Sequence, residues 1–237
     1  MVTRKDRRSW TAGEVARLVE LDPDTLGRRR DRADQEAGLT RVYRAATAGL
    51  ISELAALGMV VEEIRELVPI ADRRALPVLH KWIEDIDHDW ARREIFGVFG
   101  AAWAQPEGAR WLMDEFYRVD PSTDMDANSV RMGIGAELER RKHPSLLSEI
   151  IAVATDRSHG RHRAMFVWAL RRYSPTNVEP ALLALIRDSD DVIAAYAMNA
   201  LVKLKATLPM DGVSRLMDSR YDWVRDDATK AFRTLSS

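Results

Sequence analysis

The segment IAAYAMNAL at residues 193–201 is followed 31 residues later by VRDDATKAF at 224–232, with apolar or small residues at matching positions. Earlier copies of this pattern start near Val130 and His162, and a looser one starts near Ala91. Within each copy the apolar residues recur three or four positions apart, which is the spacing of one face of an α-helix. A fixed period of about thirty residues predicts a solenoid of stacked helix pairs. Solenoids hold partners more often than they catalyse reactions.

Each copy reads as two short helices joined by an acidic turn. We expect the first helices at residues 76–85, 107–118, 145–155, 179–187 and 212–218. An Asp follows nearly every one of them, and a further carboxylate, such as Asp190 or Asp222, stands where the second helix must start. A carboxylate there accepts hydrogen bonds from the unpaired N–H groups of the first turn. We therefore predict an all-α fold with about five helix pairs in residues 71–237.

The order of helix, Asp-bearing turn and a helix opening V-R-x-x-A-x-x-A-L resembles HEAT repeats. The match is best over residues 188–201 and 218–232. The arginine position of the repeat is occupied by Arg92, Arg131, Arg163 and Arg225, whereas Ala194 departs from it. The resemblance implies that this arginine pairs with the turn Asp of a neighbouring repeat. The alternative is a basic stripe that faces a ligand.

Composition limits the other possibilities. The 237 residues suffice for one large domain or two modest ones, and a net charge of −1 means that contact with nucleic acid must come from a local patch. The absence of cysteine excludes disulfides, thiolate nucleophiles and zinc held by cysteine. No apolar run approaches the roughly 18–20 residues of a membrane span, and the N-terminus has no apolar signal core. We expect a cytoplasmic protein that contacts no membrane.

Residues 10–69 do not follow the repeat. The segment TAGEVARL at 11–18 predicts a helix, and after a short turn an arginine-rich second helix is expected at 25–32. Two short helices about a tight turn are typical of a helix-turn-helix. A polar connection at 38–44 then leads to two more expected helices, one at 50–57 ending at Gly58 and one at 60–68 stopping at Pro69.

The ordered set of these segments resembles the DNA-binding domain of the MerR family. The matching pieces are TAGEVARL at 11–18, Thr25-Leu26, Tyr43-Arg44, residues 50–58 and residues 61–68. Gly27 stands where the family has an arginine, and the long helix that pairs two MerR subunits is absent, so a symmetric dimer is not implied. The resemblance implies a winged-helix-like head over residues 1–70, ahead of the repeat domain.

The resemblance also implies which residues contact double-stranded DNA: Thr25, Arg28, Arg29, Arg32, Arg41, Tyr43 and Arg44. The second helix would lie in the major groove, and the connection at 38–44 would act as a wing on the adjacent backbone. Residues 1–44 hold 11 Lys and Arg against 8 Asp and Glu, which is a modest local excess. The alternative is a solvated helix face, interleaved with Asp31 and Asp34, in a head that binds protein or caps the solenoid.

Two further clusters are candidates for binding. The first is a basic cluster made of Arg157, His159, Arg161, His162 and Arg163. Because it precedes the start of a helix, it can hold a phosphate or an acidic peptide. The alternative is a solvated loop between two helices. The second places His80 and His88 near acidic residues, but a spacing of eight is no known ligand motif. We therefore predict no metal and no cofactor.

Taken together, the residues favour a non-enzymatic, DNA-binding transcriptional regulator whose repeats bind a protein partner or sense a ligand. One alternative is a HEAT-repeat scaffold with the head as a structural cap. Another is a DNA alkylation-repair glycosylase with HEAT-like repeats, since such enzymes pair groove tryptophans with a catalytic Asp. The tryptophans available here are Trp82, Trp90, Trp103, Trp111, Trp168 and Trp223. Every prominent Asp, however, is already accounted for by a repeat turn.

Overall fold

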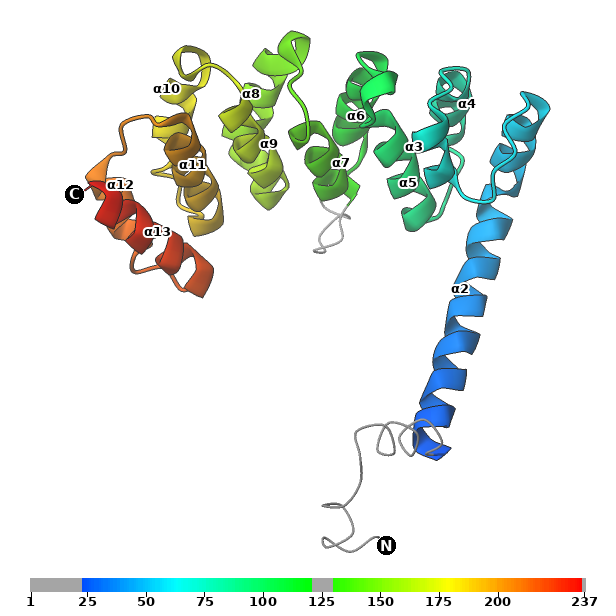
Figure 1. Cartoon of the computed structure of the whole chain (residues 1–237). Helices are drawn as coiled ribbons and strands as arrows, with labels where there is room; N and C mark the ends of the chain where they lie inside the picture. Colours follow the sequence, from blue (N-terminus) through cyan, green and yellow to red (C-terminus); the bar gives the residue numbers. More distant parts are fainter. Residues whose placement is uncertain (1–22, 121–129, 236–237) are drawn as a thin grey trace, which may run out of the picture. The chain divides into compact units, whose positions relative to one another are not determined.

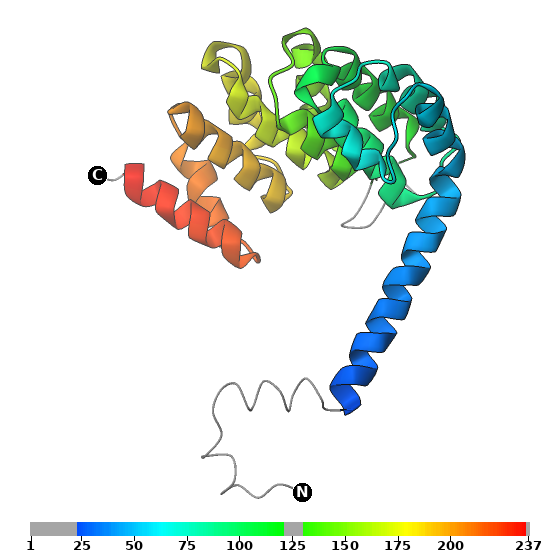
Figure 2. The same cartoon turned by 45° about the vertical axis from the view of Figure 1, so that its right-hand side comes forward.

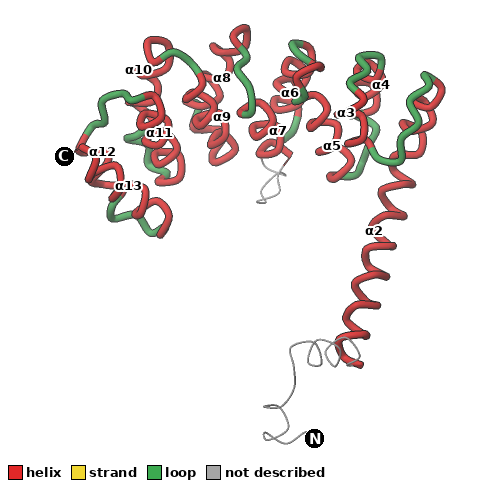
Figure 3. The backbone as a smooth tube through the Cα atoms, in the orientation of Figure 1, coloured by secondary structure: helices red, strands yellow, loops and turns green. Residues whose placement is uncertain are grey.

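The computed structural model describes residues 23–120 and 130–235, with side chains for residues 37–120 and 130–233. Every regular element in these ranges is helical, as predicted (Figure 1, Figure 3). None of these helices combines the length and the apolar character needed to cross a membrane. The chain divides into two compact units, residues 1–48 and 49–237. That division lies inside the first described helix, α2 (Pro23–Ala56), whereas we expected the second part to begin at residue 71.

The predicted second helix, polar connection and third helix of the head are one continuous helix, α2. It spans the expected segments at 25–32 and 38–44 and all but the last residue of 50–57, so the prediction of a wing at 38–44 is wrong. A proline suits the start of α2 because its missing N–H would have no partner there. Most residues that follow are strong helix formers, and Gly38, the one glycine of the predicted connection, costs only about 1 kcal/mol, which does not interrupt the helix. The helix predicted at 11–18 lies outside the described residues.

The segment after α2 is only partly helical. Gly58 has a φ of +84°, a conformation that favours glycine, and it follows the end of the helix as predicted. The helix expected at 60–68 is shorter and consists of the 3₁₀ helix η2 (Ile64–Glu66) and α3 (Leu67–Ile70). The two β-branched valines before it disfavour helix. Pro69 lies in the first turn of α3, where a missing N–H breaks no helical hydrogen bond.

The five predicted helix pairs are present. The first helices are α4 (Ala75–Trp82), α6 (Glu107–Arg118), α8 (Leu147–Thr155), α10 (Pro175–Leu185) and α12 (Met210–Leu216). The second helices are α5 (Asp89–Phe99), α7 (Val130–Glu139), α9 (Ala164–Ala169), α11 (Asp191–Leu204) and α13 (Asp222–Leu235). Short 3₁₀ helices join them: η3 (Ala102–Ala104), η4 (Pro144–Leu146), η5 (Arg157–Arg163) and η6 (Leu170–Arg172).

The pairs stack into two rows, which is the solenoid that the period predicts. Each second helix contacts the next, from α5 through α7, α9 and α11 to α13, and the first helices form the other row (Figure 1, Figure 2). The core lies between the rows. Ala197, Ala200 and Ala228 of the second helices have no exposed surface, because small residues let neighbouring helices approach closely.

Side chains in the turns start the second helices. Asp190 accepts a hydrogen bond from the backbone N–H of Val192 at 2.9 Å and so caps α11, as predicted. At α5 the cap is a histidine, since His88 Nδ1 accepts from the backbone N–H of Ala91 at 3.3 Å. These local bonds fix where the second helices α5 and α11 begin.

Candidate functional site

The repeat arginine that the sequence predicted to be structural is structural at Arg163. Its Nη2 donates to Asp188 Oδ2 at 3.0 Å, and both side chains are almost completely buried. Where Ala194 replaces the arginine, Arg215 of α12 donates instead to Asp191 at 2.8 Å. The predicted pairing of the repeat arginine with a turn Asp of the neighbouring repeat is therefore confirmed at Arg163, which is not available to a ligand. Elsewhere Arg131 donates to the carbonyl oxygen of Phe116, and Arg225 donates to Asp222 of its own helix.

His159, a second member of the predicted anion cluster, also packs internally. Its Nδ1 lies 2.8 Å from Arg131 Nη2, and its ring meets the Phe116 ring edge-on at 5.2 Å. Because a guanidinium can only donate, Nδ1 must accept, which requires the neutral form of the ring. Burial, and then the charge of Arg131, lowers the pKa of His159. His159 therefore holds the turn in place as a neutral group.

The remaining members of the cluster do not form one site. Arg157 has a side chain that is 71% exposed, with Nε 3.6 Å from Asp188 Oδ2. His162 is half-buried. Gly160 takes a φ of +54° and so turns the chain between them. Arg161 lines a cleft.

Arg161 belongs to a group that the sequence analysis did not identify. Its Nε donates to Asp190 Oδ2 at 2.7 Å, and its Nη2 donates to Tyr221 Oη at 2.6 Å. Arg220 Nη2 donates to the same Oη at 2.7 Å. These residues line a cleft of about 340 Å³, together with Ser189 and Asp191. We call this the turn cleft.

The turn cleft is built by the repeat itself. Arg161 and Asp190 are 29 residues apart and Arg161 and Tyr221 are 60 apart, so all three occupy comparable turns of successive pairs. Aligning the turns by the period of about thirty residues could have identified these three residues from the sequence. The hydrogen bond from Arg161, and to a lesser degree that from Arg220, lowers the pKa of the Tyr221 hydroxyl.

A second candidate surface lies on the row of second helices. The ring of Tyr196 in α11 lies 6.2 Å from that of Trp168 in α9 and 5.9 Å from that of Trp223 in α13. The guanidinium of Arg171 lies over Trp168 at 3.9 Å. We call Trp168, Tyr196 and Trp223 the aromatic row. Trp223 is 41% exposed and the other two rings are half-buried, so the row presents apolar surface to solvent.

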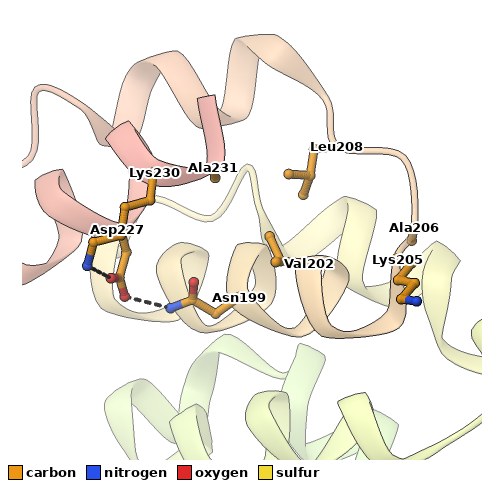
Figure 4. A pocket seen from close by; sticks show the side chains of 8 residues that line it. All are labelled: Asn199, Val202, Lys205, Ala206, Leu208, Asp227, Lys230 and Ala231. Atoms are coloured by element: carbon orange, nitrogen blue, oxygen red, sulfur yellow. Dashed lines mark hydrogen bonds and ion pairs between the residues drawn. The ribbon is translucent and has the colours of Figure 1, made fainter. Parts of the chain in front are cut away.

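A cavity lies between α11 and α13, the helices that carry Tyr196 and Trp223 (Figure 4). Asn199 follows Tyr196 by one helical turn and Asp227 follows Trp223 by one turn, and residues so spaced share a helix face. Asn199 Nδ2 donates to Asp227 Oδ2 at 2.9 Å. The cavity has a volume of about 410 Å³, and its other lining residues are Val202, Lys205, Ala206, Leu208, Lys230 and Ala231. Four of these are apolar and two carry exposed amino groups.

The predicted DNA-contact residues all lie on α2. Four of them belong to the part of α2 whose side chains are outside the described residues: Thr25, Arg28, Arg29 and Arg32. Arg41 and Arg44 are exposed and lie three residues apart on α2, so both belong to one face of a helix. They do not belong to a wing. Tyr43 is only 7% exposed, which places its ring away from solvent.

Two tryptophans considered for a base-binding groove have internal partners. Trp82 Nε1 donates to Glu53 at 2.7 Å, and the Trp111 ring stacks on His80 with centroids 4.3 Å apart. The stacking also places His80 against an indole rather than beside acidic side chains. In residues 37–120 and 130–233, no group of three His, Asp or Glu side chains is placed to hold a metal ion.

Comparison of the chain with protein-family models, curated proteins and solved structures found no match. The function must therefore be argued from the residues themselves.

Proposed function

We propose that this protein is a DNA-binding regulator whose repeat unit holds a protein partner along the aromatic row. The observation that carries the proposal is a row of three neighbouring aromatic rings on α9, α11 and α13, with a cavity between the last two of these helices. Tyrosine and tryptophan are enriched in protein interfaces, because their rings bury a large apolar area and their polar tips still find hydrogen bonds. Stacked helices hold these rings in place before binding, which lowers the entropic cost of association.

The chemistry of this surface supports one kind of partner. Lys205 and Lys230 are exposed beside the cavity, while Asp227 is engaged with Asn199 and Lys230. A segment that places apolar side chains on the aromatic row and a carboxylate next to Lys205 complements both features. The partner is therefore a protein segment in which apolar residues alternate with acidic ones.

The N-terminal part supports the DNA component. Residues 1–44 carry 11 basic against 8 acidic residues, in a chain whose net charge is −1, so the positive charge is concentrated there. Arg41 and Arg44 are exposed on one face of α2. An α-helix fits the major groove of B-form DNA, and arginines on it reach phosphates and guanine edges. A single helix can therefore supply the contacts that we had expected from a helix and a wing.

Fluorescence anisotropy with duplex DNA across a salt series tests the DNA component. We expect binding that weakens steeply with salt, and at least a tenfold loss of affinity in the double variant Arg28→Ala/Arg29→Ala. The matched control is Arg140→Ala/Arg187→Ala, which removes two exposed arginines of the repeat unit. Absence of binding at low salt would contradict the DNA component and leave a protein-interaction scaffold. An equal loss of affinity in the control would show that Arg28 and Arg29 are not the residues that contact DNA.

Selection of peptides from a random library tests the partner-binding surface. We expect the enriched peptides to combine apolar and acidic residues, and to bind Trp223→Ala about tenfold more weakly than the unchanged protein. Trp90→Ala is the matched control, because Trp90 is 53% exposed on α5 and lies outside the aromatic row. Peptides that bind the two variants equally well would rule out the aromatic row as the binding surface.

A further inference from the structure

Two cationic side chains converge on one neutral oxygen in the turn cleft. Arg161 Nη2 and Arg220 Nη2 donate to Tyr221 Oη at 2.6 and 2.7 Å, so the two nitrogen atoms lie no farther apart than these two bonds combined. Two positive charges at such a distance repel each other, and a neutral hydroxyl offsets little of that repulsion. An anion between them would offset it.

The carboxylates of the turn cleft are already engaged. One oxygen of Asp190 accepts from Arg161 and the other caps α11. Both oxygens of Asp191 accept hydrogen bonds from side chains of the following repeat. Arg220 is exposed, and its guanidinium has no carboxylate partner among the described residues. One positive charge of the cleft is therefore not compensated.

The size and lining of the turn cleft suit a small anion. Its volume of about 340 Å³ exceeds what one phosphate group needs, and every side chain that lines it carries a polar group. The hydroxyls of Ser189 and Tyr221 can act as hydrogen-bond donors beside the two guanidiniums. The arginines come from turns of different repeats, so they reach an anion from separate directions and meet different oxygen atoms.

We propose that the turn cleft binds a tetrahedral oxyanion, such as phosphate or a phosphate monoester, between Arg161 and Arg220. Oxygen atoms of the anion take the place of Tyr221 Oη as the acceptors, because hydrogen bonds between two charged groups are stronger than those to a neutral hydroxyl. The Tyr221 hydroxyl then donates to the anion. This site is separate from the aromatic row and from α2, so it stands whether or not the protein binds DNA or a protein partner.

Calorimetric titration of the full chain with inorganic phosphate, at constant ionic strength, tests the site. We expect one saturable site in the unchanged protein and at least tenfold weaker binding in Arg220→Gln, which removes an exposed side chain without a carboxylate partner. The matched control is Arg187→Gln, since Arg187 is exposed and pairs with Asp211, neither of which lines the cleft. The absence of saturable binding, or equal affinities in the unchanged protein and Arg220→Gln, would overturn the proposal.

Spectrophotometric titration of tyrosine ionisation provides a second readout. A bound anion neutralises the arginines, so phosphate should raise the pKa of the tyrosine that ionises first, and the effect should vanish in Tyr221→Phe. Acetate at the same ionic strength should have a smaller effect; an equal effect would refute a tetrahedral site. Phenyl phosphate distinguishes the two possible ligands, a phosphate monoester and the free phosphate ion. Binding as tight as that of phosphate identifies a monoester site, and weaker binding identifies a site for the free ion.

Discussion

Arg163 and Asp188 form an ion pair at 3.0 Å in which both side chains are at least 96% buried. The pair joins the turn before α9 to the turn after α10, which belong to successive repeats. Arg163 also donates to the carbonyl oxygens of Ala154 and Gly160, and Asp188 accepts from the backbone N–H of Asp190. The pair is thus satisfied by further hydrogen bonds, and removal of Arg163 leaves the buried Asp188 with the exposed Arg157, 3.6 Å away, as its remaining charged partner.

Substitution of Arg163 by Met should therefore be severely destabilising. We expect the free energy of unfolding to fall by about 3–5 kcal/mol, measured by urea denaturation. Arg187→Met is the control, because Arg187 and Asp211 form a pair with both side chains more than half exposed. Such a pair contributes at most about 1 kcal/mol. Equal losses in the two variants would show that burial does not set the strength of the Arg163 pair.

The stability of the repeat unit should fall in mild acid because of His143. Burial lowers the pKa of His143 below its ordinary value of 6.5, and its Nε2 has no hydrogen-bond partner in the described part of the chain. The unfolded state then binds a proton more readily than the folded state, so the free energy of unfolding decreases as pH falls through 6.5. His159, whose pKa is also lowered by burial, acts in the same direction.

His143→Gln should reduce this acid sensitivity. The melting temperature of the variant should decline less than that of the unchanged protein as pH falls from about 7.5 to about 5, because one of the two buried histidines is gone. His80→Gln serves as the control, since His80 stacks on an indole at the surface of the first helices. Parallel pH curves for the unchanged protein and His143→Gln would contradict the assignment.

Substitutions at Gly38 test whether residues 38–44 belong to the continuous helix α2 or form a wing. A methyl group added at this position meets no atom within 4 Å, so Gly38→Ala gains the better helix propensity of alanine, about 1 kcal/mol, at no steric cost. Hydrogen exchange of the amides in residues 38–44 should slow in Gly38→Ala. Gly38→Pro should have the opposite effect, because proline costs about 3 kcal/mol inside a helix. Unchanged exchange in both variants would support a non-helical connection at 38–44.

Gly108 should not tolerate a side chain. A Cβ atom there would lie 2.2 Å from the carbonyl oxygen of Phe99, because the start of α6 passes directly over the end of α5. Gly108→Ala should cost about 1–3 kcal/mol of unfolding free energy, as overpacking does in other cores. Gly133→Ala in α7 is the matched control: its Cβ meets nothing within 4 Å, and alanine should stabilise the helix by roughly 0.5–1 kcal/mol. Denaturation of both variants checks the prediction, which fails if Gly108→Ala is as stable as the unchanged protein.

The helix pairs were predictable because their signals are local. The apolar spacing of Ile193, Ala197 and Ala200 marks one face of α11, and Asp190 caps the same helix through a bond to a residue two positions away. The segment at 38–44 was predicted wrongly because its conformation depends on residues outside the segment. A single glycine among polar residues reads as a loop, whereas the helical tendency of the residues on both sides outweighs it in α2.

The sequence by itself determined the repeat and its helices, because both follow from residues at a fixed period, and the resemblance to HEAT repeats implied that Arg163 pairs with a turn Asp of a neighbouring repeat. Only the tertiary structure decided which side chains meet when they do not occupy equivalent positions of the repeat. Arg220 reaches the same oxygen atom as Arg161 although they belong to different repeats, and Tyr196 bridges Trp168 and Trp223 across three helices. A period specifies which positions are equivalent, but the rotation and offset between stacked pairs set the distances between their side chains. Those quantities depend on how the whole core packs, which no single segment encodes.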